Sequence, residues 1–153
     1  MVRRRSYGQL NENNETVVKL LLNTGTVEVN SKDRFSQTPL LWTAERGYEA
    51  VVKLLLGTGN VEIDSKDDND KTPLSWAIKN GHKTMVKKLL NTGKVDVNSK
   101  NRFGQIPLMW AAERGHEAVV KLLLNTGKVE INSKDRFGLT PLWWALWKAL
   151  RHS

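Results

Sequence analysis

The chain has 153 residues, of which 39% are hydrophobic and 26% charged, and its formal net charge is +8. These values are ordinary for a soluble folded domain, and no apolar run reaches the 18 residues that a membrane span needs. Because cysteine is absent, disulfides, zinc–thiolate sites and thiol catalysis are excluded. We expect an intracellular protein, placed in the cytoplasm with the nucleus left open. A basic charge fits either an acidic partner or a lysine-rich solvated surface, so it decides nothing alone.

A 34-residue period organises the sequence. A Pro-Leu pair recurs at this spacing, at Pro39, Pro73, Pro107 and Pro141. A Thr-Gly pair and a Ser-Lys pair recur at the same spacing, and residues 33–66 and 101–134 are alike at most positions. Self-similarity at a fixed period of this length is the signature of a repeat protein.

Each period begins with a short helix whose two ends are visible in the sequence. Thr38 is a good N-cap, and Pro39 suits the first helical position because its missing N–H would be unpaired there anyway. Gly47 can take the left-handed conformation that closes a helix. We therefore predict a short first helix that begins at Pro39 and ends at Gly47.

A second helix is predicted from about Tyr48 to Leu56. Its apolar residues are nearly continuous, with Lys53 as the solvated interruption, and so wide a stripe packs on more than one neighbour. Thr58 and the glycine after it close the helix, residues 61–64 alternate like a strand, and a turn follows. The predicted unit is helix, turn, helix and an extended connection.

One such pair of helices cannot bury its own apolar surface, so consecutive units must stack. The predicted fold is therefore all-α, a solenoid of stacked helix-turn-helix units with β-turn or hairpin-like connections and a 34-residue period. We expect a single domain over residues 1–153. Its expected parts are a degenerate N-terminal cap (about 1–32), three repeats (33–66, 67–100 and 101–134) and a truncated repeat (135–153).

The two ends of the array depart from this unit. At the N-terminus the polar segment RRRSYGQLNEN stands where a first helix belongs, which predicts a polar cap before an ordinary second helix, ETVVKLLL. Near the C-terminus Ala149 and Leu150 replace the Gly-His break between helices. No second helix is then expected to cover the apolar residues Trp143, Trp144, Leu146, Trp147 and Leu150.

Three alternatives fit this C-terminal sequence. The last helix is longer, amphipathic and folded back on the preceding repeat, or the chain is a piece of a larger array, or the apolar end self-associates. We favour a piece of an array or a natural truncated end over a dimer, and we expect a monomer.

The unit resembles the ankyrin repeat. Residues 104–132 read GQIPLMWAAERGHEAVVKLLLNTGKVEIN, which is similar to the family's Gly-x-Thr-Pro-Leu, Ala-Ala, Gly-His, Val-Val-x-Leu-Leu-Leu, Gly and Val-Asn pattern. The resemblance covers roughly residues 10–150 and implies a module that binds a partner protein. The Thr-Gly-Lys-Val and Pro-Leu-x-Trp motifs also resemble, more loosely, the arrays of fungal NLR-type receptors, in which the chain would be the sensor part.

Three features depart from the family's pattern. Each repeat is one residue longer than the common 33, and the extra residue falls in the connection after the second helix. Ile106 replaces the capping threonine, which should cost that helix ~1 kcal/mol. The hydrogen bonds of the family's histidine after Thr-Pro-Leu are in doubt, because its place is taken by Leu41, Ser75, Met109 and Trp143.

Tryptophan recurs once per repeat, at Trp42, Trp76, Trp110 and Trp144. Stacked repeats would align these indoles, with neighbouring helices ~8–10 Å apart. Packing between adjacent first helices is the interpretation that we favour, and an aromatic floor on the concave face is the alternative. In three repeats a cation four residues further on could lie over the ring: Arg46, Arg114 and Lys148.

The turns before the first helices hold another register, at Arg34-Phe35, Asp68-Asn69, Arg102-Phe103 and Arg136-Phe137. The resemblance implies that these turns and the exposed first-helix positions form a concave binding surface, and arginine and aromatic side chains are common anchors of interfaces. A phenylalanine that only covers the turn of the next repeat is the alternative. By resemblance, the residues that bind the partner are Arg34, Phe35, Gln37, Glu45, Arg46, Asp68, Asn69, Lys71, Lys79, Asn80, Arg102, Phe103, Gln105, Glu113 and Arg114.

Nucleic-acid binding fits the sequence less well. Arginine beside phenylalanine suits phosphate contacts with base stacking, and a lysine accompanies each turn, at Lys32, Lys66, Lys100 and Lys134. Acidic residues in the same turns, Asp33, Asp67 and Asp135, would repel phosphates.

Catalysis fits it least. His82 and His116 occupy a position that Tyr48 fills in another copy, which indicates a structural role, and His152 lies near the C-terminus. The sequence has no glycine-rich phosphate loop, nucleophile elbow or metal-ligand spacing. We expect no enzyme activity, no cofactor, no metal and no membrane partner. The competing function is a structural, self-associating array.

Overall fold

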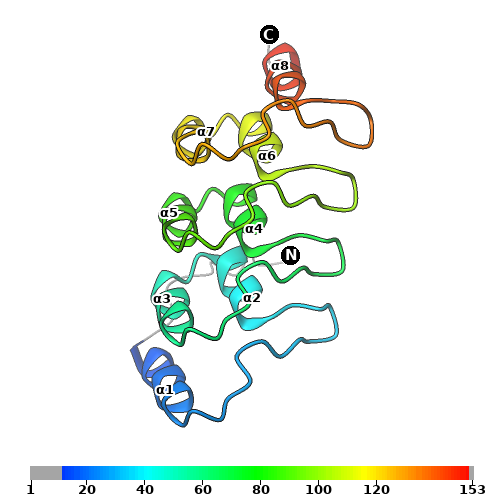
Figure 1. Cartoon of the computed structure of the whole chain (residues 1–153). Helices are drawn as coiled ribbons and strands as arrows, with labels where there is room; N and C mark the ends of the chain where they lie inside the picture. The colour runs from blue at the N-terminus through cyan, green and yellow to red at the C-terminus, as the bar shows by residue number, and fades with distance from the viewer. Residues whose placement is uncertain (1–11, 152–153) are drawn as a thin grey trace, which may run out of the picture.

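The computed structural model describes residues 12–151, in which every regular element is an α-helix. The helices are α1 (Glu12–Asn23), α2 (Pro39–Arg46), α3 (Glu49–Gly57), α4 (Pro73–Lys79), α5 (Lys83–Asn91), α6 (Pro107–Glu113), α7 (Glu117–Leu124) and α8 (Pro141–Arg151). They stand in two columns, and loops project from one column only (Figure 1). We call the even-numbered helices, from which the loops project, first helices and the odd-numbered ones second helices. The predicted all-α solenoid is confirmed.

The first helices begin and end as the sequence predicts. The Thr38 hydroxyl accepts a hydrogen bond from the Leu41 N–H at 3.2 Å, and Gly47 closes α2 with a φ of 75°. Thr72 caps α4 in the same way. At α6 the N-cap is Ile106, whose side chain offers no such bond, so the predicted loss of a cap is confirmed.

The second helices end at the Thr-Gly pairs. In α3 the Thr58 hydroxyl donates to the Leu55 carbonyl at 2.7 Å, which satisfies one of the last carbonyl groups of the helix. The same bond recurs at 2.7 Å in the other three copies, from Thr24, Thr92 and Thr126.

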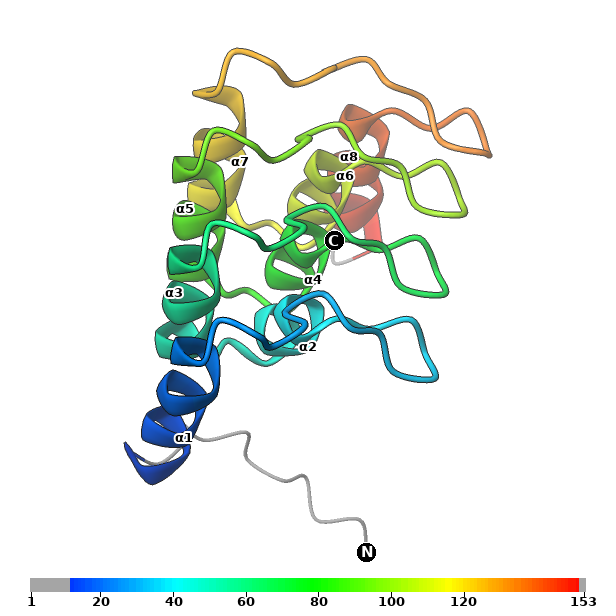
Figure 2. The same cartoon turned by 60° about the horizontal axis from the view of Figure 1, so that its bottom comes forward.

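The strand-like segment predicted for residues 61–64 is wrong, because no strand forms there and the chain turns at Ile63 and Asp64. The backbone groups bond to a side chain of the preceding repeat instead of to a strand. The Glu62 N–H donates to Asn30 Oδ1 at 2.8 Å, and Asn30 Nδ2 donates to the Asn60 carbonyl at 2.8 Å. Successive connections therefore run side by side without a β-ladder (Figure 2).

The apolar core lies between the two columns. One buried cluster of side chains extends from α2 to α7, and it includes the leucine of each Pro-Leu pair from Leu40 to Leu108. None of the helices within residues 12–151 is both long and apolar enough to cross a membrane.

Both ends of the array leave apolar side chains uncovered. Most of the segment predicted as a polar cap lies outside the described range, but its last two residues, Glu12 and Asn13, form the start of α1. The α1 helix exposes Val17, Leu20 and Leu21. At the other end α8 is one unbroken helix beside α6, as the missing Gly-His break predicts. The side chains left exposed on it are Leu142, Trp143, Leu146, Trp147 and Leu150.

Trp144 is the exception among the residues expected to be uncovered. It is half-buried, and its Nε1 donates to Asp135 Oδ2 at 2.9 Å. Its position in α8 is the one that Trp76 holds in α4, where the same bond to an aspartate forms. The repeat therefore holds this indole even at the end of the array.

Candidate functional site

Four turn loops, residues 33–37, 67–71, 101–105 and 135–139, precede the first helices. In the second loop Asp67 Oδ1 accepts hydrogen bonds from the Asn69 N–H at 2.9 Å and the Lys71 N–H at 3.0 Å. The Asp67 N–H in turn donates to the Lys71 carbonyl at 3.0 Å. The same set of bonds forms at Asp33, Asn101 and Asp135.

Neighbouring turn loops are tied to each other. The Arg136 N–H donates to the Phe103 carbonyl at 2.8 Å, and the Arg102 guanidinium donates to the Asp68 carbonyl at 2.8 Å. Longer backbone bonds of 3.4 Å join Asp68 to Phe35 and Arg102 to Asn69. The loops therefore form an ordered row along one side of the solenoid (Figure 1).

Three of the turn loops carry a phenylalanine that is exposed to solvent. Phe35 is 53% exposed, Phe103 40% and Phe137 67%. The Arg34 guanidinium carbon lies 4.8 Å from the centre of the Phe35 ring. The contact with the next loop is made by the phenylalanine carbonyl, so the exposed rings favour a binding role over a covering role.

The cations near the tryptophans match the prediction in one repeat. Arg46 lies over the Trp42 ring, with its guanidinium carbon 3.7 Å from the ring centre. Neither Arg114 nor Lys148 lies over the indole of its own repeat, so the prediction is wrong at these two positions. Stacking brings cations of the preceding repeat to Trp110 instead, and these are Lys71 and Lys79.

Lys71 and Lys79 share one site with two indoles, and we call these four residues the lysine–indole cluster. Lys71 Nζ lies 4.5 Å from the centre of the Trp76 ring and 5.5 Å from that of Trp110. Lys79 Nζ lies 5.0 Å and 5.5 Å from the same two rings. Both side chains are half-buried. Attraction to the ring faces stabilises each ammonium, but the two ammoniums repel one another.

The surroundings of Lys71 lower its pKa. Burial, followed by the hydrogen bond and the positive charge of Lys79, lowers the pKa of Lys71 from 10.5 to about 8. Asp67 and Glu45 oppose the shift more weakly. The Asp67 carboxylate also fixes one indole of the cluster, because its Oδ2 accepts from Trp76 Nε1 at 2.7 Å.

In the preceding repeat the charged residues Glu45 and Arg46 pair with each other. Glu45 Oε2 lies 3.2 Å from the Arg46 guanidinium and accepts from Gln37 Nε2 at 3.3 Å. The Glu45 carbonyl also accepts from Asn80 Nδ2 at 2.8 Å. Five of the predicted site residues therefore stabilise the scaffold or each other: Gln37, Glu45, Arg46, Asn80 and Arg102.

Three other predicted binding residues lie outside the lysine–indole cluster. Glu113 and Arg114 follow one another at the end of α6 and form no ion pair within residues 12–151. Gln105 accepts a hydrogen bond from the Asn101 side chain at 2.9 Å within its own loop. Trp76 and Trp110 were not among the predicted binding residues, although the spacing from Trp76 to Lys79 by one helical turn was a signal for the cluster.

His82 contacts the preceding repeat, as the structural interpretation of this position predicts. His82 Nε2 lies 3.0 Å from the Glu45 carbonyl, and a Cβ built on Gly47 would lie 2.8 Å from the His82 ring. Burial and the charge of Arg114 lower the pKa of His116. Within the described range no group of three or more histidines and carboxylates could hold a metal, and His152 lies outside that range.

Stacked helical hairpins with a row of projecting turn loops define a class of repeat scaffold proteins. A family model described as ankyrin repeats (three copies) matches residues 9–101 and 89–152. The chain belongs to the ankyrin repeat family. No curated protein matches it at a significant level. Ankyrin repeats generally mediate protein–protein interaction and are typically non-catalytic.

Proposed function

We propose that the chain binds a partner protein through the loop face, meaning the surface formed by the turn loops and the exposed sides of the first helices. The lysine–indole cluster is the anchor of this surface, and the group that it takes is a carboxylate of the partner. The single observation that carries the proposal is the pair of half-buried ammoniums over Trp76 and Trp110.

A carboxylate suits this site for an electrostatic reason. The positive charge of Lys79 helps to lower the pKa of Lys71, and neither lysine forms an ion pair with any carboxylate in residues 12–151. An incoming anion would relieve the repulsion between them, and the half-buried setting screens the attraction less than open solvent does. The indoles add apolar surface beside the charge.

The rest of the loop face supplies further contacts. Arg34, Phe35 and Phe103 are exposed on the turn loops before and after that of the cluster, and such side chains are the usual hot spots of interfaces. We expect Arg34→Ala combined with Phe103→Ala to weaken partner binding at unchanged helicity.

Phosphate groups would be attracted to the same ammoniums. The carboxylates of Asp67 and Asp135 bond to their own turn loops and to an indole, which orients them but does not remove the repulsion that they exert on a phosphate. A nucleic-acid ligand is therefore an outcome of the test. The role of sensor in an NLR-type receptor and the intracellular location stay predictions, since the family match covers the repeats alone.

A displayed peptide library selected on the 153-residue chain tests the proposal. We expect the selected peptides to be rich in Asp and Glu and to lose at least ten-fold in affinity on Lys71→Ala/Lys79→Ala. The matched control is Lys53→Ala/Lys87→Ala, which removes the same charge from exposed positions on second helices. Equal losses from the two double variants would contradict a specific cluster.

Two further measurements separate the sources of binding. Affinity for a selected acidic peptide should fall as pH rises through about 8, because Lys71 then loses its proton. A mixed-sequence RNA oligonucleotide titrated in parallel should bind more weakly than the peptide. Tighter RNA binding that weakens steeply with salt would replace the proposed protein partner with a nucleic acid.

A further inference from the structure

The two ends of the array expose opposite halves of one repeat. The helix α8 is a first helix, and within the described residues no second helix of the same repeat lies beside it. The helix α1 is a second helix, and within those residues no first helix of the same repeat lies beside it. The exposed face of α8 is therefore the face that a second helix covers in a complete repeat. The exposed face of α1 is the face that a first helix covers.

Leu142 shows what α8 lacks. Its counterparts one, two and three repeats earlier, Leu108, Leu74 and Leu40, are 4%, 1% and 0% exposed and belong to the buried core. Leu142 itself is 68% exposed. Leu146, one helical turn further on, is 44% exposed, whereas its counterparts Ala44 and Ile78 are fully buried.

Val17 and Leu21 show the matching deficit on α1. They are 52% and 53% exposed. Their counterparts in α3, Val51 and Leu55, are 5% and 3% exposed, and those in α5 and α7 are buried as well. These two positions face the first helix of their own repeat wherever that helix is present, because they lie in the core between the columns.

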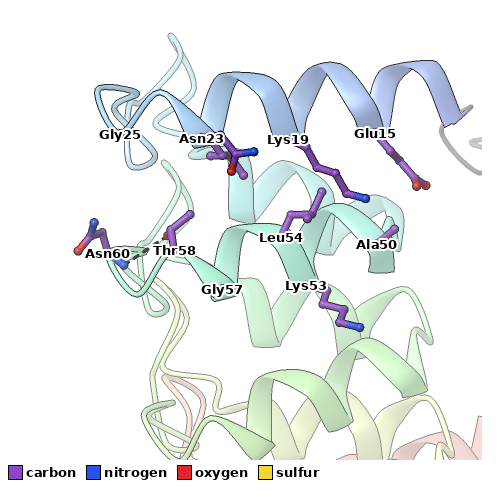
Figure 3. Close-up of a pocket in the computed structure, with 11 residues that line it drawn as sticks. Glu15, Lys19, Asn23, Gly25, Ala50, Lys53, Leu54, Gly57, Thr58 and Asn60 are labelled. Carbon is purple, nitrogen blue, oxygen red and sulfur yellow. Dashed lines mark hydrogen bonds between the residues drawn. The ribbon is translucent and has the colours of Figure 1, made fainter.

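The column of second helices carries a second matching pair. Leu22 of α1 and Leu54 of α3 line one groove between these helices, and Leu54 points toward α1 (Figure 3). At the far end of the column Leu124 of α7 holds the position of Leu22 and is 41% exposed, while Leu20 of α1 holds the position of Leu54 and is 63% exposed. Leu20 and Leu124 thus hold the two positions whose counterparts, Leu54 and Leu22, line one groove between neighbouring second helices.

We infer that the chain associates head to tail with a second copy of itself. The α1 helix of one copy lies beside α7 and α8 of the other, in the place that a second helix takes in a complete repeat. Val17 and Leu21 then cover Leu142 and Leu146, and Leu20 meets Leu124. The occupant is a second copy because this contact continues, in the same register, the interface that already joins the repeats within one chain.

Head-to-tail contacts are heterologous, so each added copy leaves one fresh end and the assembly grows with concentration. A symmetric contact of α8 with α8 differs in this respect, because it stops at a dimer and leaves α1 uncovered. The two arrangements can therefore be separated by blocking one end at a time.

Two variants block the ends. Val17→Glu/Leu21→Glu closes the α1 end, and Leu142→Glu/Leu146→Glu closes the α8 end, both at exposed positions. In light scattering over a range of concentrations the unblocked chain should grow beyond a dimer, and each variant alone should stay monomeric. An equimolar mixture of the two should form a one-to-one dimer with about twice the mass of either alone, because each keeps the end that the other needs.

The Lys87→Glu variant, which places a glutamate at an exposed position in the middle of the array on α5, is the control that should assemble like the unblocked chain. Circular dichroism checks that every variant keeps its helicity, and Leu20→Glu with Leu124→Glu repeats the mixing test at the other contact. A monomeric unblocked chain at all concentrations would overturn the inference. So would a mixture that stays monomeric, or an α1-blocked variant that still dimerises.

Discussion

Leu74 and Leu142 are the same residue at the same place in two copies of one repeat, yet their surroundings differ completely. Leu74 is 1% exposed in the middle of the array and Leu142 is 68% exposed at its end. Both follow a proline at the start of a first helix. Burial of this leucine is therefore conferred by the helices packed around it, from its own repeat and the next, and not by its own helix.

The largest expected effect separates these two leucines. Leu74→Ala should lower the free energy of unfolding by ~2–5 kcal/mol, because it leaves a cavity in the core. In dilute solution Leu142→Ala should change it by no more than about 0.5 kcal/mol, as expected for an exposed site. Urea denaturation followed by circular dichroism measures both free energies of unfolding. Similar losses in the two variants would show that the difference in burial does not determine the contribution of each leucine.

A glycine series tests contacts with the next repeat at one position of the unit. Gly47, Gly81 and Gly115 hold one position with positive φ, so alanine at any of them costs about 1–2 kcal/mol. A Cβ on Gly47 would lie 2.8 Å from the His82 ring, one on Gly81 would lie 3.6 Å from His116, and one on Gly115 would meet nothing within 4 Å.

Overpacking should therefore add ~1–3 kcal/mol at Gly47 alone. Thermal or urea unfolding of the three alanine variants gives the order, with Gly47→Ala the least stable. Adding His82→Ala to Gly47→Ala should recover the overpacking part of the loss. Three equal losses would show that the ring does not limit the site.

A smaller effect is expected at Asp64, which holds the position of Asn30 and Asn98. Both asparagines donate from Nδ2 to a carbonyl of the next repeat at 2.8 Å, whereas Asp64 has no such donor and its buried Oδ1 has no partner within the described range. Asp64→Asn should therefore stabilise the chain by ~0.5–1.5 kcal/mol at pH 7.

The gain from Asp64→Asn should shrink in acid. Burial, helped by the charge of Asp96, raises the pKa of Asp64 above 3.8. Between 3.8 and the raised value the folded chain binds more protons than the unfolded chain, so the wild type loses stability as pH rises through that window. Unfolding midpoints of the two proteins should converge as pH falls, and a constant difference would contradict this origin.

A further effect, which appears only in alkaline solution, is expected from Lys71. Its pKa is about 8 in the folded chain and 10.5 as a free side chain, so between these values the unfolded chain binds more protons. The contribution of Lys71 to stability should therefore rise as pH increases from about 8 to 10.5. The difference between the wild type and Lys71→Met in urea midpoints isolates this slope, and no change in that difference would contradict it.

The sequence predicts those parts of the fold that depend on local chemistry. Thr38, Pro39 and Gly47 determine the ends of α2 by capping and backbone preference, and Thr58 determines the end of α3. The 34-residue period predicts the stacking because each copy has the same apolar surface, which a neighbouring copy must cover. Each of these signals lies within a few residues of its effect.

The parts that sequence reasoning missed depend on contacts between repeats. The strand-like alternation of residues 61–64 gives way because Asn30, a residue of the preceding repeat, takes the hydrogen bonds of that segment. The cations over Trp110 come from Lys71 and Lys79 rather than from Arg114, since stacking places them closer. The lysine–indole cluster therefore forms only when adjacent repeats stack.

Hydrogen exchange of the backbone amides in dilute solution tests most directly the claim that each repeat is held by its neighbours. The account predicts slow exchange from α3 to α6 and much faster exchange in α1 and α8, with protection falling toward both ends. Protection of α8 equal to that of α4 under the same dilute conditions would contradict it.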